Sequence, residues 1–315
     1  MPELMLSVVQ NIAVLAFSVL LLAYSSDYFT EGAARVARRL GVSRFIIGAV
    51  VIGFGTSSPE LFSSVYASLM NAGGVALGNV VGSNIANIGL ILGSAAFIRP
   101  ALVRQKIEYI NAAACLLLTA LAALLILAGG VVSRTDGFLL LGVFAVYIYY
   151  SIKNPNNTVY ARDTDEDSER AAVHLLLGLG GVLAGSILLV NSAVAVARGL
   201  GVPESVIGLT LVAFGTSVPE LAVSIVAARK GYYTMVVGNV VGSNVFNILL
   251  VLGAAAVAAP IPADAAILYR SIPAVLFITG AMLLFMRTGW RVSRIEGAVL
   301  LLFYLGFLQL SFGAI

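Results

Sequence analysis

The chain has 315 residues, of which 60% are hydrophobic and only 10% are charged, and its formal net charge is +3. A soluble domain of this size needs more charged side chains to cover its surface, so this composition excludes a soluble protein. It predicts a polytopic membrane protein instead. The basic excess does not indicate nucleic-acid binding, because the placement of these residues in loops beside the membrane accounts for it.

Ten hydrophobic segments follow one another along the chain, each near the ~20 residues that cross a bilayer core. The first lacks the basic start and cleavage site of a signal peptide, so we expect it to be retained as a helix. Asp27, Glu31 and Arg35 are expected to continue this helix along the membrane interface. We predict an all-α fold with ten transmembrane helices. Their ranges are 7–32, 43–70, 75–98, 107–128, 135–152, 171–199, 203–228, 234–258, 266–287 and 293–313.

The loops distribute Lys and Arg unequally between the two sides of the membrane. Fifteen of the 18 fall on one side, and the other side receives Arg134, Arg198 and Arg270. Because basic loops stay in the cytoplasm, the first side is predicted to be cytoplasmic. We therefore expect a multi-pass protein of the cell membrane with both termini outside.

The one long loop, 153–170, divides the chain into a first unit, 1–152, and a second unit, 171–315. It is rich in Asp and Glu and lies on the predicted cytoplasmic side. We interpret this loop as a solvated linker. A regulatory Ca²⁺ site is the alternative, although the loop lacks the Gly and the ligand spacing of an EF-hand.

A polar stretch, Phe54-Gly55-Thr56-Ser57-Ser58-Pro59-Glu60, interrupts the second segment. Pro59 has no N–H, so a helix running through it loses one backbone hydrogen bond. Glu60 would lie at membrane depth, where an ionised carboxylate is costly and indicates a functional site. Freed carbonyls, the hydroxyls of Thr56 and Ser57 and one carboxylate are the oxygen ligands that a hard cation prefers.

The stretch occurs again 160 residues later, as Phe214-Gly215-Thr216-Ser217-Val218-Pro219-Glu220. A second pair of stretches has the same offset, Gly82-Ser83-Asn84-x-x-Asn87 and Gly242-Ser243-Asn244-x-x-Asn247. The chain is therefore a duplicated unit, and interrupted hydrophobic segments at matching places point to a transporter binding site. Because each unit holds five predicted helices, an odd number, the second unit must enter the membrane from the opposite side.

Glu60 and Glu220 are the only acidic residues predicted at mid-membrane, and no basic residue is predicted at that depth. A bound cation would offset the cost of their charges, whereas the alternative is a structural pair of protonated glutamates. Ser83 and Asn87 lie four residues apart and share one helix face, as do their counterparts in the second unit. They are either further cation ligands or hydrogen-bonding groups that hold helices together.

The doubled pattern GTSxPE followed by GNxxGSNxxN resembles the two alpha-repeats of the sodium/calcium exchanger family, within the wider cation/calcium antiporter superfamily. The resemblance covers both halves of the chain. It implies a ten-helix fold in which helices two, three, seven and eight hold four adjacent cation sites. It also implies that helices one and six slide as a looser pair to give alternating access.

The resemblance further implies a set of cation ligands. Glu60 and Glu220 would be shared central ligands, and Ser83 and Ser243 would complete the outermost and innermost sodium sites. The remaining positions would supply hydroxyl, amide or backbone oxygens, and they are Thr56, Ser57, Thr216, Ser217, Asn87, Asn247, Gly53 and Ala213. Some family members, including potassium-dependent exchangers, carry Asp where this chain has Asn247, so a dependence on K⁺ is not expected.

We therefore expect a secondary antiporter that exchanges Na⁺ for Ca²⁺, with three Na⁺ per Ca²⁺ and net charge movement. Both ions would be substrates, and we expect no cofactor, no nucleic acid and no obligate protein partner besides the lipid bilayer. A proton/cation antiporter of the same superfamily is the first alternative, although its relatives usually show a GNAxE-type motif. A cation channel is less favoured, and one His and one Cys leave little from which to build an enzyme.

Overall fold

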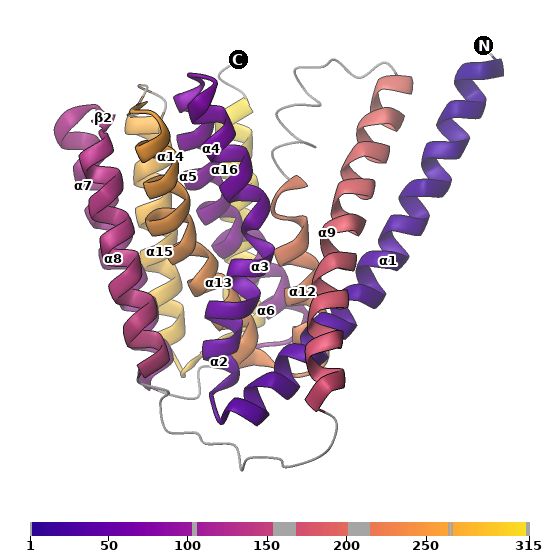
Figure 1. The fold of residues 1–315 in the computed structure, drawn as a ribbon, viewed down its shortest axis with the longest axis horizontal. Helices are drawn as coiled ribbons and strands as arrows, with labels where there is room; N and C mark the ends of the chain where they lie inside the picture. Colours follow the sequence, from indigo (N-terminus) through magenta and orange to yellow (C-terminus); the bar gives the residue numbers. More distant parts are fainter. Residues whose placement is uncertain are drawn as a thin grey trace.

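The computed structural model describes residues 2–102, 106–153, 168–200, 215–263, 265 and 267–312. These residues form a bundle of helices with two short strand pairs (Figure 1). In the first unit the elements are α1 Pro2–Leu40, α2 Arg44–Ile46, η1 Ile47–Ile52, α3 Gly53–Thr56, α4 Ser58–Leu69, α5 Gly73–Ala86, η2 Asn87–Leu92, α6 Gly93–Ile98, β1 Ala101–Leu102, α7 Lys106–Gly129, β2 Val131–Val132 and α8 Arg134–Lys153. In the second they are α9 Ser168–Gly199, α12 Val218–Arg229, α13 Tyr233–Phe246, η4 Asn247–Val251, α14 Leu252–Ala258, β3 Ile261–Pro262, η5 Ile267–Ser271, α15 Ile272–Arg287, β4 Arg291–Val292 and α16 Arg294–Phe312.

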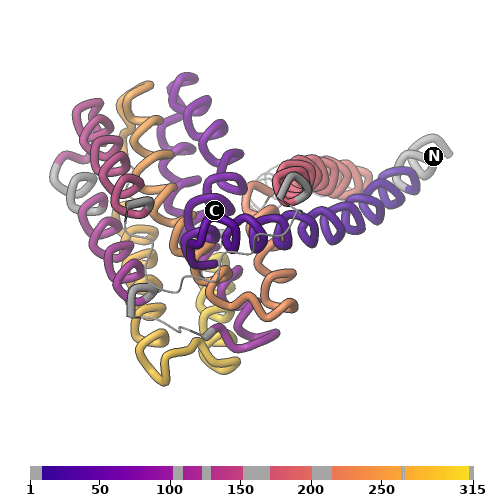
Figure 2. Tube along the Cα trace, turned by 60° about the horizontal axis from the view of Figure 1, so that its bottom comes forward, coloured from indigo at the N-terminus to yellow at the C-terminus, as the bar shows by residue number. Residues whose placement is uncertain are grey.

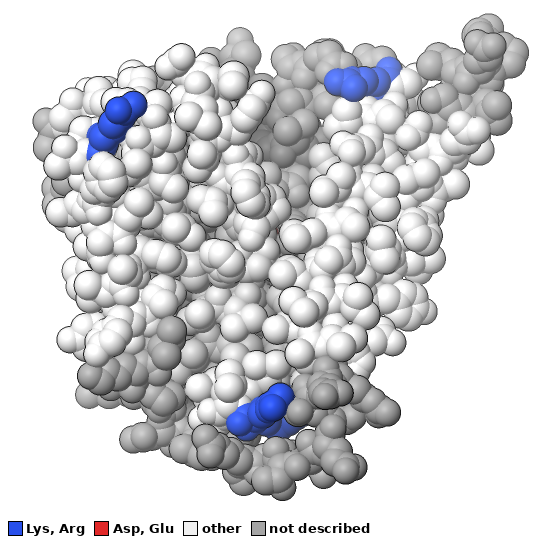
Figure 3. All heavy atoms as spheres, viewed as in Figure 1, with Lys and Arg blue, Asp and Glu red and all other residues white. Residues whose placement is uncertain are grey.

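Each predicted segment coincides with a helix or a run of helices, and residues 203–214 of the seventh lie outside the described residues. By length and composition, six helices of the described chain can cross a membrane, or seven if the bent run from α2 to α4 counts as one. Figure 3 shows Lys and Arg side chains at the two ends of the face in view, with a broad band free of charged colours between them. This pattern is typical of a multi-pass membrane protein.

The two units run in opposite directions. The helix α1 descends in Figure 1 while α9, its counterpart in the second unit, ascends beside it. Figure 2 shows this pair at one edge of the bundle, where α1 also contacts α12 and η1. The helices α1 and α9 approach closely because glycines face each backbone: a Cβ at Gly178 would overlap the backbone of Phe29, and one at Gly32 would overlap that of Leu175.

The best-buried spans are those with small residues. The span of α13, η4 and α14 is 83% buried, whereas the window in α16 is 17% buried. A Cβ at Gly242 would overlap the backbone of Ala49, so only glycine lets α13 lie directly against the run of η1 and α3. This contact joins the interrupted helix of the first unit to the second unit.

Two antiparallel strand pairs also connect the units. The strand β1 pairs with β4, Ala101 opposite Val292, and β2 pairs with β3, Val132 opposite Ile261. Each pair takes one strand from each unit. The two units are therefore joined through the loops between their spans as well as through their helices.

The helix α1 continues to Leu40, beyond the predicted span 7–32, as expected for a helix that carries Asp27, Glu31 and Arg35 along the membrane interface. Its polar end is held by the turn between α12 and α13. Lys230 Nζ lies 2.8 Å from Asp27 Oδ1, and the Tyr232 hydroxyl donates to Glu31 Oε2 at 3.0 Å. Burial and the adjacent Glu31 carboxylate raise the pKa of Tyr232, so its hydroxyl remains a donor. The expectation that Asp27 lies beside basic residues is confirmed.

Candidate cation-binding site

Each of the two carboxylates lies at the start of a helix, α4 in the first unit and α12 in the second. The run from α2 to α4 bends by 45° at Ser57, whose backbone has φ −84° and ψ 7°. Ser217 has nearly the same conformation, φ −89° and ψ 1°, immediately before α12. A proline follows in the first turn of each restarted helix, where its missing N–H costs nothing. Glu60 and Glu220 therefore lie in first turns, where the helix dipole favours negative charge.

The carboxylates are held across the duplication. The Ser57 hydroxyl donates to Glu220 Oε1 at 2.9 Å, and Thr56 of the same unit lies close to Glu220 as well. Conversely, Thr216 of the second unit lies close to Glu60 of the first. The two carboxylates are also near enough to interact electrostatically. Both carboxylates are 1% exposed. The structure thus brings together five residues that the sequence predicted for one site.

Several oxygens at these positions have no protein partner. Within the described residues, no hydrogen bond reaches Glu60 Oε2, Glu220 Oε2, Ser243 Oγ or Asn247 Oδ1, and all four atoms are buried. The ion pairs of the described residues include neither glutamate. A buried polar atom without a partner costs about 1–3 kcal/mol, more if it is charged. A cation is the kind of group that satisfies several buried oxygens at once.

The asparagines of the second motif begin two matching irregular turns. Asn87 opens the π-helical segment η2, and Asn247 opens η4. The segment η4 packs against α4, which carries Glu60, and η2 packs against α12, which carries Glu220. Single π-helical turns are frequent at functional sites. Both asparagines are therefore brought beside the carboxylate helix of the other unit.

The amide groups of these asparagines also form packing hydrogen bonds. Asn87 Nδ2 donates to Asn244 Oδ1 at 3.0 Å, and Asn247 Nδ2 donates to Asn84 Oδ1 at 3.1 Å. The interpretation as helix-packing groups is thus correct for their nitrogens, while Asn247 still has a free oxygen. Asn84 and Asn244 also belong to the duplicated motif, but their spacing alone did not predict a role for them.

The other predicted positions are placed as follows. The Gly53 carbonyl accepts the Ser57 N–H at 3.0 Å, and a Cβ at Gly53 would lie 3.4 Å from Ser243 Oγ, so these two positions adjoin. Ser83 and Ser217 are buried at 4% and 2% exposure. Ala213 lies outside the described residues.

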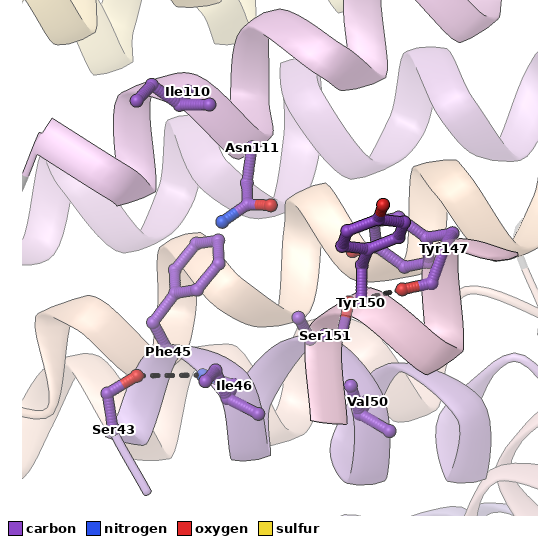
Figure 4. A pocket seen from close by; sticks show the side chains of 10 residues that line it. Ser43, Phe45, Ile46, Val50, Ile110, Asn111, Tyr147, Tyr150 and Ser151 are labelled. Atoms are coloured by element: carbon purple, nitrogen blue, oxygen red, sulfur yellow. Dashed lines mark hydrogen bonds between the residues drawn. The ribbon is translucent and has the colours of Figure 1, made fainter. Parts of the chain in front are cut away.

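One cavity, of about 280 Å³, lies away from the carboxylates, between the start of the second span and the helices α7 and α8 (Figure 4). In Figure 4, Ser43 accepts the Ile46 N–H at one side and Asn111 projects from another. None of its lining residues is acidic or was predicted as a ligand. The carboxylates are instead enclosed by tightly packed helices, which suits small ions.

A duplicated bundle with a bent helix in the first unit and a buried carboxylate pair between the units is typical of a membrane transporter. The family described as sodium/calcium exchanger protein matches residues 10–153 and again residues 170–313. The chain belongs to this family, which confirms the resemblance predicted from the doubled motif.

Individual relatives of the chain support its assignment to this family. The sodium/calcium exchanger MaX1 of Methanosarcina acetivorans is 33% identical, over 96% of this chain and 98% of its own length. The putative antiporter CaxA of Alkalimonas amylolytica is 37% identical, over 94% of this chain and 97% of its own length. A solved structure of the sodium-calcium exchanger NCX_Mj superposes with a TM-score of 0.86 at 36% identity, covering 95% and 97% of the two chains. These relatives are exchangers and antiporters, so the expectation that the chain is not an enzyme is confirmed.

Proposed function

We propose that this protein is a secondary antiporter that exchanges Na⁺ for Ca²⁺ across the membrane by alternating access. The observation that carries the proposal is the pair of buried carboxylates, Glu60 and Glu220, each with one oxygen unpartnered within the described residues. Two anionic groups at this depth need a compensating positive charge. The names of the relatives MaX1 and NCX_Mj favour Na⁺ and Ca²⁺ as the ions that provide it.

The proposed ligands are the residues that the motif predicts. Glu60 and Glu220 serve all the central ions, and Ser83 and Ser243 complete the two outer sodium sites. Thr56, Ser57, Thr216, Ser217, Asn87, Asn247 and the carbonyls of Gly53 and Ala213 supply the remaining oxygens. The cross-unit contacts of Ser57, Thr56 and Thr216 support this set, because they place hydroxyls of one unit at the carboxylate of the other.

The proposed architecture has ten transmembrane helices in two inverted units, 1–152 and 171–315, joined by a cytoplasmic linker, 153–170. The two stretches matched by the family support this division. The helices α1 and α9 would form the pair that moves, since they pack closely on each other at one edge of the bundle. Both termini would face outside, and the working unit would need only its ions and the bilayer.

Uptake of ⁴⁵Ca²⁺ into proteoliposomes under separate Na⁺, H⁺ and K⁺ gradients tests the function. We expect uptake when Na⁺ is inside and absent outside, and little uptake under the other two gradients. Uptake driven by the H⁺ gradient alone would instead identify a proton/Ca²⁺ antiporter. Uptake without any counter-ion gradient would identify a channel.

A further inference from the structure

Four asparagines form a crossed arrangement at the contact between the two units. Asn84 of the first unit accepts from Asn247 of the second, and Asn244 of the second accepts from Asn87 of the first. Asn84 Nδ2 also lies 3.4 Å from the backbone carbonyl of Asn244. All four side chains are at most 2% exposed. Each proposed ligand amide is therefore bonded to an asparagine of the opposite unit.

The bond to Asn84 decides which way the Asn247 amide points. An amide has its nitrogen and oxygen on opposite edges, so a nitrogen that donates to Asn84 leaves the oxygen directed away from Asn84. This oxygen is buried and has no hydrogen-bond partner within the described residues. If the amide turned over, its N–H groups would face any bound cation and repel it.

Asn84 itself is not placed to bind an ion. Its oxygen accepts from Asn247, and its nitrogen donates to the Asn244 carbonyl. On its other side is a void of only about 20 Å³, which is lined mainly by aliphatic side chains. Both polar ends of this side chain are thus occupied in orienting its neighbours.

We propose that Asn84 and Asn244 are positioning residues that hold the Asn247 and Asn87 amides with their oxygens available to the transported cation. This inference rests on the proposed function, because it requires Asn87 and Asn247 to be ligands. Partners that orient a metal ligand commonly cost 10–100-fold in metal affinity when removed. The crossed pairing also makes the ligands of each unit depend on the other unit.

A double-mutant cycle tests the inference. Wild-type protein, Asn84→Ala, Asn247→Ala and the double variant are purified, and ⁴⁵Ca²⁺ affinity and Na⁺-driven uptake are measured for each. We expect each single variant to bind Ca²⁺ about tenfold more weakly. We expect the double variant to be no weaker than Asn247→Ala, because Asn84 acts only through that amide. The mirror cycle, Asn244→Ala with Asn87→Ala, should behave alike.

Asn239→Ala is the matched control. Like Asn244, Asn239 is a buried asparagine of α13, but its amide donates to Ser224 Oγ at 3.0 Å rather than contacting a proposed ligand. In the double variant of Asn239→Ala with Asn247→Ala, the fold-changes in Ca²⁺ affinity of the two single variants should multiply. Melting temperatures show whether each variant is folded, and Asn84→Ser, which keeps an oxygen acceptor, replaces Asn84→Ala if the latter does not fold.

The results separate this inference from the proposed function. Effects of Asn84→Ala and Asn247→Ala that multiply would overturn the positioning role, as would a lower melting temperature with unchanged affinity. An Asn247→Ala variant that binds Ca²⁺ normally would also overturn it, while leaving Na⁺-driven exchange intact. Wild-type protein that shows no Na⁺-driven uptake would refute the proposed function and this inference with it.

Discussion

Glu60 and Glu220 each present one buried carboxylate oxygen that no described residue satisfies. Their other contacts are hydroxyls and backbone groups rather than basic side chains. A positive charge beside these carboxylates would therefore be stabilising. An Arg or Lys partner would neutralise them permanently. At the scale of single residues, no basic side chain of the described residues pairs with these groups, which suits them to a mobile cation.

Replacing either glutamate by Gln tests whether the charge of its carboxylate is needed for transport. Glu60→Gln or Glu220→Gln keeps the shape of the side chain but removes one charge, so Na⁺-driven ⁴⁵Ca²⁺ uptake should fall to near background. The melting temperature should be unchanged or higher, because an uncompensated buried charge is lost. Glu296→Gln is the control, since Glu296 is not a proposed ligand and accepts from the Ser293 N–H and the Thr288 hydroxyl at the start of α16. Uptake at the wild-type rate in either site variant would contradict the ligand assignment.

The neutral amide of Asn247 leads to a prediction about K⁺. Its oxygen is available, but it adds no charge to hold an additional monovalent ion. Na⁺-driven Ca²⁺ uptake should therefore be unchanged when choline replaces K⁺ on both sides of the vesicle membrane. A large loss of uptake on this replacement would show that K⁺ is a co-substrate.

At the scale of elements, the contact between α1 and α9 depends on individual glycines. A Cβ at Gly178 would overlap the Phe29 backbone, whereas Gly180, two residues later on the same helix, is exposed with nothing within 4 Å of an added Cβ. These two positions have the same sequence character and opposite structural roles.

Substitution by Ala should therefore have opposite effects at these two glycines. Gly178→Ala should lower the melting temperature and the exchange rate, because α1 and α9 would be forced apart. Gly180→Ala should stabilise the protein by about 0.5–1 kcal/mol, since Ala favours the helix over Gly. Thermal unfolding and uptake of the two purified variants provide the comparison. Equal effects of both substitutions would rule out this close packing.

At the scale of the whole molecule, the units are joined by strand pairs, by α13 against the run of η1 and α3, and by the crossed asparagines. These connections make the bundle one body. In contrast, α1 meets the turn between α12 and α13 through ion pairs of partly exposed side chains and a hydrogen bond from Tyr232 to Glu31. Such ion pairs are individually weak, ~0–1 kcal/mol each. The two units of the bundle are thus held together more firmly than α1 is held against this turn.

The charge of the proposed site predicts electrogenic exchange. Two ionised carboxylates are neutralised by one Ca²⁺ and left with one positive charge by three Na⁺. Each cycle would then move one net charge, worth about 2.3 kcal/mol per 100 mV. An inside-positive potential, set with K⁺ and valinomycin, should accelerate Ca²⁺ entry coupled to Na⁺ exit. Uptake that ignores the potential would indicate two Na⁺ or two H⁺ per Ca²⁺.

The sequence by itself determined the membrane class, the approximate positions of the helical segments, the duplication and the candidate ligands. Hydropathy, Pro59 and Pro219, and a motif repeated at a fixed offset are local features, so they can be read without coordinates. The tertiary structure alone decided the partners: Ser57 with Glu220, and Asn84 with Asn247. It also placed Glu31 of α1 against Tyr232. These contacts join residues far apart in the chain, and no local pattern specifies which face of one helix meets another.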